Sequence, residues 1–149
     1  ENNFSQGKTI YPTNTGFGIS YSLPIIVACL IAKKDRLLVI ENPEAHLHPS
    51  GIAKLTELIC IAAEAGIQII IETHSDHIIN GILVQSKLYE ENGRGINKNN
   101  VSIYQFDRDE NEHCTKAIEV HIENGGKLKN QPIGFFDQIE IDLEKLMGF

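Results

Sequence analysis

Long apolar segments and positive charge are both scarce in this sequence of 149 residues. The longest apolar run, Leu23–Ala32, is about half a membrane span and contains Pro24. No signal peptide precedes it, so we expect a cytoplasmic protein without a membrane segment. Lysines and arginines number 13 against 20 aspartates and glutamates. The resulting net charge of −7 argues against an extended basic surface for nucleic acid.

Cysteine is also scarce. Cys29, Cys60 and Cys114 are widely spaced and form no CxxC motif. Cys29 and Cys60 lie in apolar stretches with helical character, which predicts buried free thiols and fits a reducing compartment. Hydrophobic residues make up 42% of the chain, enough for one globular domain with a real core.

The sequence contains no complete phosphate-binding P-loop. Gly7-Lys8-Thr9 looks like the end of one, but the first glycine of the motif would fall on Asn2. The P-loop also needs a helix after it, which Tyr11-Pro12 blocks. We therefore interpret Glu1–Thr15 as an exposed lead-in segment.

Two short apolar runs each end in polar residues. Leu37–Ile40 leads into Glu41-Asn42-Pro43-Glu44, and Ile67–Ile71 leads into Glu72-Thr73-His74. Such unbroken runs are typical of parallel strands buried on both faces. Between them, about Ser50–Ala65, apolar residues recur at helical spacing. Strand, helix and strand with short connections predict a parallel βαβ unit, with both polar ends at one edge of the sheet.

The segment before this unit predicts a helix that follows a glycine-rich turn. Gly16-Phe17-Gly18-Ile19-Ser20 opens an apolar stretch that runs to Ala32. Ser20 is expected to cap the helix and Pro24 to lie in its first turn, where a missing N–H costs little. A glycine-rich turn that enters a helix can bind anions.

The C-terminal part predicts a helix, a β-hairpin and a terminal helix. We expect the first helix at about His77–Tyr89, capped by Ser75 or Asp76. The hairpin strands are expected at Val101–Phe106 and Thr115–Ile122, with a solvated tip at Asp107–His113. The terminal helix, Phe135–Met147, is expected to bury one face made of Phe135, Phe136, Ile139, Leu143 and Leu146. We divide the chain into residues 1–90 and an accessory segment, 91–149.

The polar residues at the two strand ends are those that nucleoside triphosphatases use. A carboxylate at a strand end, here Glu41, holds a magnesium ion. The next polar residue orients the attacking water, which must be held closely in line. A histidine on the neighbouring strand, here His74, contacts the terminal phosphate.

On these motifs the chain resembles the C-terminal half of an ABC-type ATPase domain of the RecF/SMC/OLD group. More narrowly, it is similar to bacterial AAA/ABC ATPases with a short C-terminal segment. Ile40–Pro49 matches that group's Walker B sequence, Asp-Glu-Pro-Glu-x-His-Leu-His-Pro, and Ile71–Ser75 matches its switch-histidine strand. The resemblance implies that His74 senses the γ-phosphate. It also implies that Gly16, Gly18 and Ser20 are a signature-like motif that completes the ATP site of an opposing subunit.

Three positions depart from the family pattern. Glu41 replaces the aspartate of the magnesium site, and Gly16 stands where a serine is expected. Asn42 replaces the catalytic glutamate; its amide can position a water but cannot accept a proton as general base. Glu44 or Glu72 would then supply the missing carboxylate, or hydrolysis would be slow. The candidate catalytic residues are Glu41, Asn42, Glu44 and His74.

The resemblance implies an α/β, P-loop NTPase-like fold and a parent protein that hydrolyses ATP with Mg²⁺. We expect this chain alone to bind ATP weakly and to be inactive, because the P-loop cradle for the phosphates is missing. The expected partners are an N-terminal P-loop half of the same domain and a second subunit, in a head-to-tail homodimer. DNA repair or phage defence is implied as the process; DNA binding gains no support from the charge.

Two other hypotheses stay open. The first is a non-hydrolytic scaffold or switch, which Asn42 at the catalytic glutamate position would indicate. The second is a metal-dependent hydrolase, with His46-x-His48 as ligands together with His74, Asp76 and His77.

Overall fold

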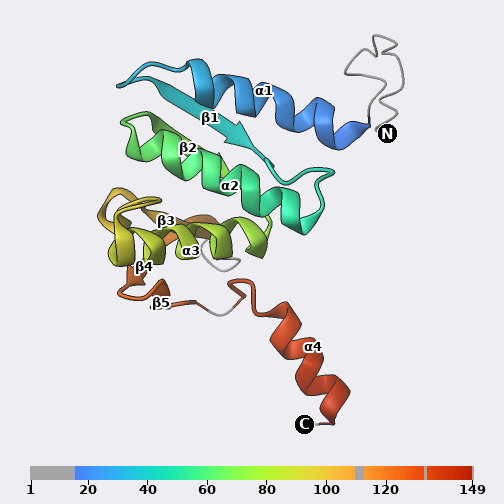
Figure 1. Cartoon of the computed structure of the whole chain (residues 1–149). Helices are drawn as coiled ribbons and strands as arrows, with labels where there is room; N and C mark the ends of the chain where they lie inside the picture. Colours follow the sequence, from blue (N-terminus) through green and yellow to red (C-terminus); the bar gives the residue numbers. More distant parts are fainter. Residues whose placement is uncertain (1–15, 110–112, 133, 149) are drawn as a thin grey trace, which may run out of the picture.

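The computed structural model describes residues 16–109, 113–132 and 134–148 (Figure 1). Gly7-Lys8-Thr9, the lead-in segment and the middle of the hairpin tip lie outside these residues. The N-terminal part consists of α1 (Phe17–Ile31), β1 (Leu37–Glu41), α2 (Pro49–Glu64), β2 (Gln68–Glu72) and α3 (Asp76–Asn92). The C-terminal part consists of a 3₁₀ turn (Lys98–Asn100), β3 (Ile103–Asp109), β4 (Cys114–Glu123), β5 (Lys127–Lys129) and α4 (Gln138–Met147).

The predicted βαβ unit is confirmed. β1 and β2 pair in parallel, in a register that runs from Leu37 opposite Gln68 to Glu41 opposite Glu72. The connecting helix α2 begins at Pro49, where a missing N–H leaves no helical bond unmade. Its N-cap is His48, whose ring nitrogen accepts a hydrogen bond from the Ser50 N–H at 3.3 Å.

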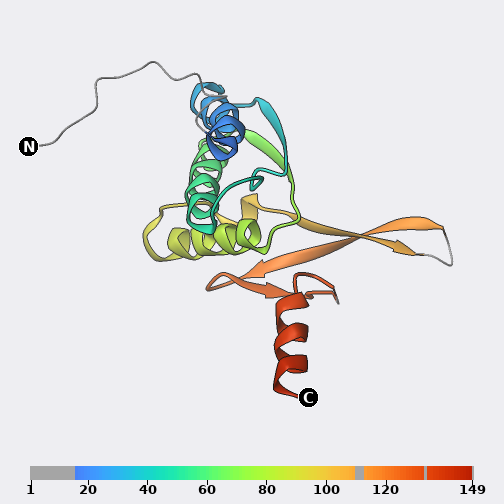
Figure 2. The ribbon, with the colours of Figure 1, turned by 90° about the vertical axis from the view of Figure 1, so that its right-hand side faces the viewer.

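The main core lies between the β1–β2 sheet and two helices on the same side of it. Figure 2 shows α1 and α2 stacked on one side of β1 and β2. The core residues come from α1, β1, α2 and the residue before β2: Cys29, Ile40, Leu55, Ile59, Ala62 and Ile67. Cys29 and Cys60 are buried free thiols, as predicted, and burial raises the pKa of Cys60 to about 12.

The expectation that β1 and β2 are buried on both faces was wrong for the described residues. Val39 is 65% exposed and Ile70 is 51% exposed, and both lie on the sheet face opposite α1 and α2. The two strands form a sheet of their own, and the described helices cover only one of its faces. The apolar runs therefore form a sheet face that the described residues leave exposed.

The start of α1 also differs from the prediction. Gly16, at φ 106°, is the N-cap, and the helix begins at Phe17. Ser20 therefore lies inside the helix and does not cap it. Pro24 lies in the helix interior instead of the first turn, and its ring removes one helical hydrogen bond. The backbone conformation of Gly16 is one that side chains disfavour, so glycine suits this N-cap position.

The second sheet packs on α3. β3 and β4 form the predicted hairpin, which reaches beyond the rest of the molecule, and β5 adds a third strand that the sequence did not indicate (Figure 2). A second core joins α3 to this sheet and to the segment after it, through Ile79, Ile103, Val120 and Phe135. Glu90 of α3 also accepts the Gly125 N–H at 2.7 Å and pairs with Lys98. These contacts, the Gly125 bond foremost, hold the pKa of Glu90 below its usual range.

The prediction of a buried face on the terminal helix was wrong for three of its five residues. Phe135 is buried, but it lies before α4. Ile139, Leu143 and Leu146 are exposed, because α4 points away from the body of the molecule (Figure 1). Within the described residues, no helix combines the length and the apolar character needed to cross a membrane.

The helices α2 and α3 approach each other closely at Gly81. A Cβ on Gly81 would lie 2.8 Å from Cγ2 of Thr56. Thr56 is fully buried, and its hydroxyl donates to the Ile52 carbonyl, so this side chain has little room to move.

We predict that Gly81→Ala lowers the free energy of unfolding by about 1–3 kcal/mol, the usual cost of overpacking. Gly51→Ala in α2 is the matched control, because its added Cβ would meet no atom nearer than 3.9 Å. That substitution should raise stability by about 0.5–1 kcal/mol through helix propensity. Urea denaturation measures both variants; equal stability of the two would contradict the tight contact.

Candidate functional site

The two acidic strand ends lie side by side at the carboxyl edge of the sheet. Glu41 and Glu72 are register partners, so their side chains leave the same face of two strands about 4.8 Å apart. Both side chains are exposed. His74 contacts one of the two, Glu72: its Nε2 lies 2.9 Å from Oε1 of Glu72, and its side chain is 83% exposed. The structure thus brings together the candidate metal ligand and the candidate phosphate sensor.

Asn42 continues the parallel pairing beyond β1 and then turns the chain. Its N–H donates to the Glu72 carbonyl at 2.9 Å, and its own carbonyl accepts the Ala45 N–H at 3.0 Å. Its φ is 45°, in the left-handed region that asparagine tolerates better than most side chains. This backbone constraint favours asparagine over glutamate here, and no sequence pattern indicated it.

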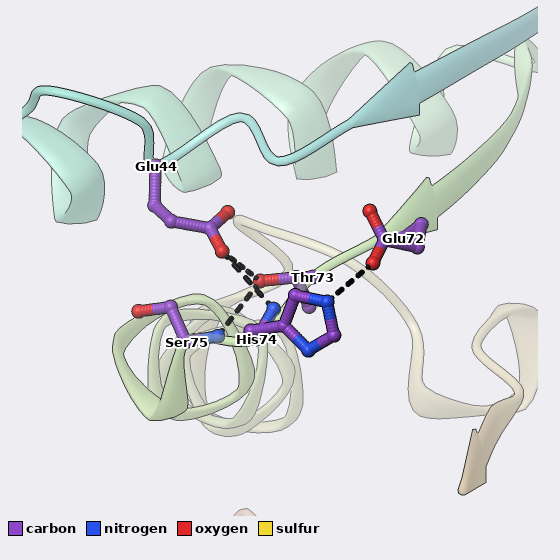
Figure 3. A network of polar contacts seen from close by, with 5 residues as sticks. All are labelled: Glu44, Glu72, Thr73, His74 and Ser75. Carbon is purple, nitrogen blue, oxygen red and sulfur yellow. Dashed lines mark hydrogen bonds and ion pairs between the residues drawn. The ribbon is translucent and has the colours of Figure 1, made fainter. Parts of the chain in front are cut away.

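Glu44 links the turn after β1 to the turn after β2 (Figure 3). Its Oε1 accepts the Thr73 hydroxyl at 2.8 Å and the His74 N–H at 3.1 Å. The Thr73 Oγ1 in turn accepts the Ser75 N–H at 3.0 Å. The Oε2 atom of Glu44 is buried and has no hydrogen-bond partner among the described residues. Sequence reasoning missed Thr73, because its partner lies 29 residues away and only the fold brings them together.

The signature-like stretch packs against the same turn. The His46 ring, on a residue at φ 62°, lies 5.4 Å from the Phe17 ring and 4.9 Å from the Tyr21 ring, centroid to centroid. A Cβ on Gly18 would lie 2.8 Å from the His46 carbonyl oxygen, so only glycine fits there without a shift. A pocket of about 340 Å³ between α1 and β1 reaches from Tyr21 to Asn42.

The other two residues of that stretch bond to each other. Ser20 donates from both its N–H and its hydroxyl to the Gly16 carbonyl, at 3.3 and 3.4 Å. Of the three residues predicted to bind nucleotide, Gly18 is therefore the one that contacts the turn after β1 directly.

Two histidines of the metal-hydrolase hypothesis, His46 and His48, make structural contacts. His46 packs on two aromatic rings, and Nδ1 of His48 lies 2.9 Å from the Ser50 hydroxyl at the start of α2. In the described part of the chain, no three His, Cys, Asp or Glu side chains are grouped so that they could hold a metal ion. The geometry does not support a His-x-His metal centre.

The acidic pair fits magnesium better. Mg²⁺ in nucleotide sites binds one or two carboxylates, with waters and substrate phosphates as its other ligands. Glu41 and Glu72 provide two exposed carboxylates on the open face of the sheet. Glu41 would hold such an ion, as its sequence position predicts.

A groove of about 680 Å³ separates the two sheets. Among the described strands, β2 pairs only with β1 and β3 only with β4, and the unpaired edges of β2 and β3 both line this groove. Most of its lining is apolar, including Ile71, Ile78 and Phe135. Gln105 adds a buried Oε1 that finds no partner among the described residues.

A parallel βαβ unit with a carboxylate, an amide and a histidine at its carboxyl edge is consistent with an AAA-type ATPase domain. Residues 1–80, more than half of the chain, match the family described as "AAA domain, putative AbiEii toxin, Type IV TA system". The chain belongs to this AAA domain family. Residues 96–146 match a second family, described as "Protein of unknown function (DUF3696)".

A curated relative supports the same group. The chain is similar to the Old nuclease of Escherichia phage P2, with 40% identity over 48 residues. These residues are 32% of this chain and 8% of that protein, so the match spans a small part of the relative's length.

We predict that Asn42→Glu lowers the free energy of unfolding by about 1–2 kcal/mol, because a longer side chain disfavours the left-handed backbone. Asn42→Gly relieves the same strain and should cause no loss. Urea denaturation of both variants measures the difference. If Asn42→Glu were as stable as the parent chain, the turn would not constrain this residue.

Proposed function

We propose that this chain supplies the magnesium-binding and phosphate-sensing edge of an ATP-hydrolysing AAA-type ATPase. The observation that carries the proposal is the juxtaposition of Glu41, Asn42, Glu72 and His74 at the carboxyl ends of paired parallel strands. Ligands bind at this edge in open α/β sheets. Family membership supports ATP and Mg²⁺ as the cofactors.

Each residue at the edge has a proposed role. The Glu41 carboxylate would hold the magnesium ion, which would neutralise charge on the phosphates. His74 is exposed and contacts the terminal phosphate. The Asn42 amide orients the attacking water but accepts no proton. Glu72 has one oxygen beside His74, but its side chain is 49% exposed, so it is better placed as a substitute base than Glu44, whose Oε1 accepts two bonds and whose Oε2 is buried.

The phosphate cradle would come from a P-loop half of the domain, since this sequence holds no complete P-loop motif. We propose that this P-loop half docks in the groove between β2 and β3. A strand added there in parallel to β2 would end beside His74, and the loop after it would reach the same edge as Glu41. It would also pair the unpaired edges of two strands, which proteins rarely leave open.

A head-to-tail homodimer is the second proposed assembly. It gains support from the start of α1, where Phe17, Ile19 and Tyr21 are all more than half exposed. These residues surround Gly18 and lie next to the turn after β1, so a facing subunit there would meet both motifs.

Asn42 is the observation that favours a second candidate, a non-hydrolytic scaffold or switch. Such a protein would bind ATP and change conformation without turnover, since no carboxylate occupies the usual base position. The biological process we propose is defence against phage or DNA repair, which is what the resemblance to the RecF/SMC/OLD group implies. DNA as a ligand gains no support from the net charge of −7.

We predict that this chain alone does not hydrolyse ATP, whereas a longer protein that adds a P-loop does. In that protein, Glu41→Ala should abolish turnover, because it removes the magnesium ligand. Asn42→Glu should raise a slow turnover by restoring a base. Phosphate release measures the rate.

Glu57→Ala is the matched control, because Glu57 lies on α2, where it pairs with Lys54. It should leave turnover unchanged. Turnover by this chain alone, or no effect of Glu41→Ala, would overturn the assignment. Nucleotide binding without turnover in the parent and in Asn42→Glu would favour the scaffold.

The groove leads to a separate prediction on backbone amides. Gln68 donates its N–H to Arg36 on the β1 side, and the Glu72 carbonyl accepts from Asn42 on that side. Backbone groups alternate in direction along a strand, so the amides of Ile69 and Ile71 face the groove. They should exchange with solvent faster than those of Gln68 and Ile70 in this chain.

In the longer protein, the Ile69 and Ile71 amides should become protected, as an added strand would bond to them. Hydrogen exchange followed by NMR measures both pairs, and Gln68 and Ile70 serve as internal controls. Unchanged exchange at Ile69 and Ile71 in a longer protein that hydrolyses ATP would reject the groove as the docking place.

A further inference from the structure

Glu44 has different partners from Glu41 and Glu72, the other acidic residues at this edge. Its Oε1 receives two donors from the turn after β2, the Thr73 hydroxyl at 2.8 Å and the His74 N–H at 3.1 Å. Figure 3 shows Glu44 pointing from the turn after β1 toward this second turn, while Glu72 meets the His74 ring. The Glu44 carboxylate therefore connects the two strand ends, because it binds both a side chain and a backbone N–H of the turn after β2.

We propose that Glu44 is a positioning residue, which fixes the backbone of His74 relative to the Glu41–Asn42 turn and does not itself touch substrate. The proposal rests on the proposed ATPase function and deepens it. In this proposal, Glu44 couples the position of Glu41, the proposed magnesium ligand, to that of His74, the proposed phosphate sensor.

The two oxygens of Glu44 argue against the alternative role of general base. A base must contact the water whose proton it takes. Oε1 is already engaged by two donors, and Oε2 is buried among protein atoms. Glu72 also has a partner, His74 Nε2 at 2.9 Å from its Oε1, but its side chain is 49% exposed and within reach of a water at the same edge.

The hydrogen bonds of Thr73 extend this control to the next helix. The Thr73 Oγ1 donates to Glu44 and accepts the Ser75 N–H, and the Ser75 hydroxyl accepts the His77 N–H at the start of α3. Three consecutive residues, Thr73 to Ser75, are thus held in one chain of bonds that begins at Glu44. Hydrogen bonds to a charged acceptor are the stronger kind, which suits a carboxylate to this role.

The decisive test compares Glu44→Gln with Glu44→Ala. Glutamine keeps a carbonyl oxygen that accepts both bonds, whereas alanine removes the acceptor. In the longer, P-loop-containing protein, Glu44→Ala should lower kcat by up to about 10²-fold, the loss that a small misplacement can cause. Glu44→Gln should restore most of that activity, and the pH profile of kcat should match that of the parent. Equal losses in both variants, with a changed acid limb of the pH profile, would show a base and overturn the proposal.

A second measurement uses this chain and needs no ATPase activity. The amide NMR signals of His74 and Ser75 should shift and lose exchange protection in Glu44→Ala, and in Thr73→Val for Ser75. In Glu44→Gln they should stay close to the parent signals. Unchanged His74 and Ser75 signals in Glu44→Ala would also overturn the proposal.

Glu64 is the matched control for this measurement. Its Oε2 accepts the Asn97 N–H at 3.0 Å, so it also binds a backbone amide distant in sequence. Glu64→Ala should shift the Asn97 signal and leave that of His74 in place. The NMR arm separates this proposal from the proposed function: if Glu41→Ala left ATP turnover intact, the ATPase assignment would fail while the Glu44 contacts were still tested.

Discussion

Parallel backbone pairing between β1 and β2 is the interaction on which the candidate site depends. The pairing begins before the strands, with Gln68 donating to Arg36, and ends beyond them, with Asn42 donating to Glu72. Because the register places Glu41 opposite Glu72, two carboxylates meet on one face. A slip of one residue would turn one of them to the opposite face and separate them.

The turn after β1 is held by contacts on two sides, with the end of β2 and with α1, which explains its unusual backbone. Asn42 and His46 both adopt positive φ, a conformation that costs free energy unless the surroundings enforce it. Glu44 fastens the turn to β2, and the His46 ring and carbonyl pack against α1. Strain of this kind is common at functional sites, and here it lies between the proposed magnesium and phosphate positions.

Among the described residues, helices cover only one face of the β1–β2 sheet. α1 and α2 cover one face with a continuous core, while Val39 and Ile70 remain exposed on the other. A groove with two unpaired strand edges lies next to this open face. A two-stranded parallel sheet is marginal by itself, since such sheets are normally buried on both faces. The described residues therefore have the form of a partial domain, and the candidate site residues lie at one edge of its sheet.

Elements with local signals could be predicted from the amino-acid sequence alone. The apolar runs, the helical spacing of α2 and the short connections were sufficient for the βαβ unit and for Glu41 and His74 at one edge. The prediction failed for the burial of the strand faces, the start of α1 and the buried side of α4. Those properties depend on what packs against a segment, and an apolar pattern is the same whether its partner is present or absent.

The contacts that assemble this edge of the sheet could be seen only in the folded chain. The bond between Glu44 and Thr73 spans 29 residues, and neither residue type indicates the other. The left-handed backbone of Asn42 likewise depends on the turn that encloses it. Local sequence determines hydrogen bonds and spacing within an element, whereas contacts between distant turns follow from the register and packing of the whole sheet.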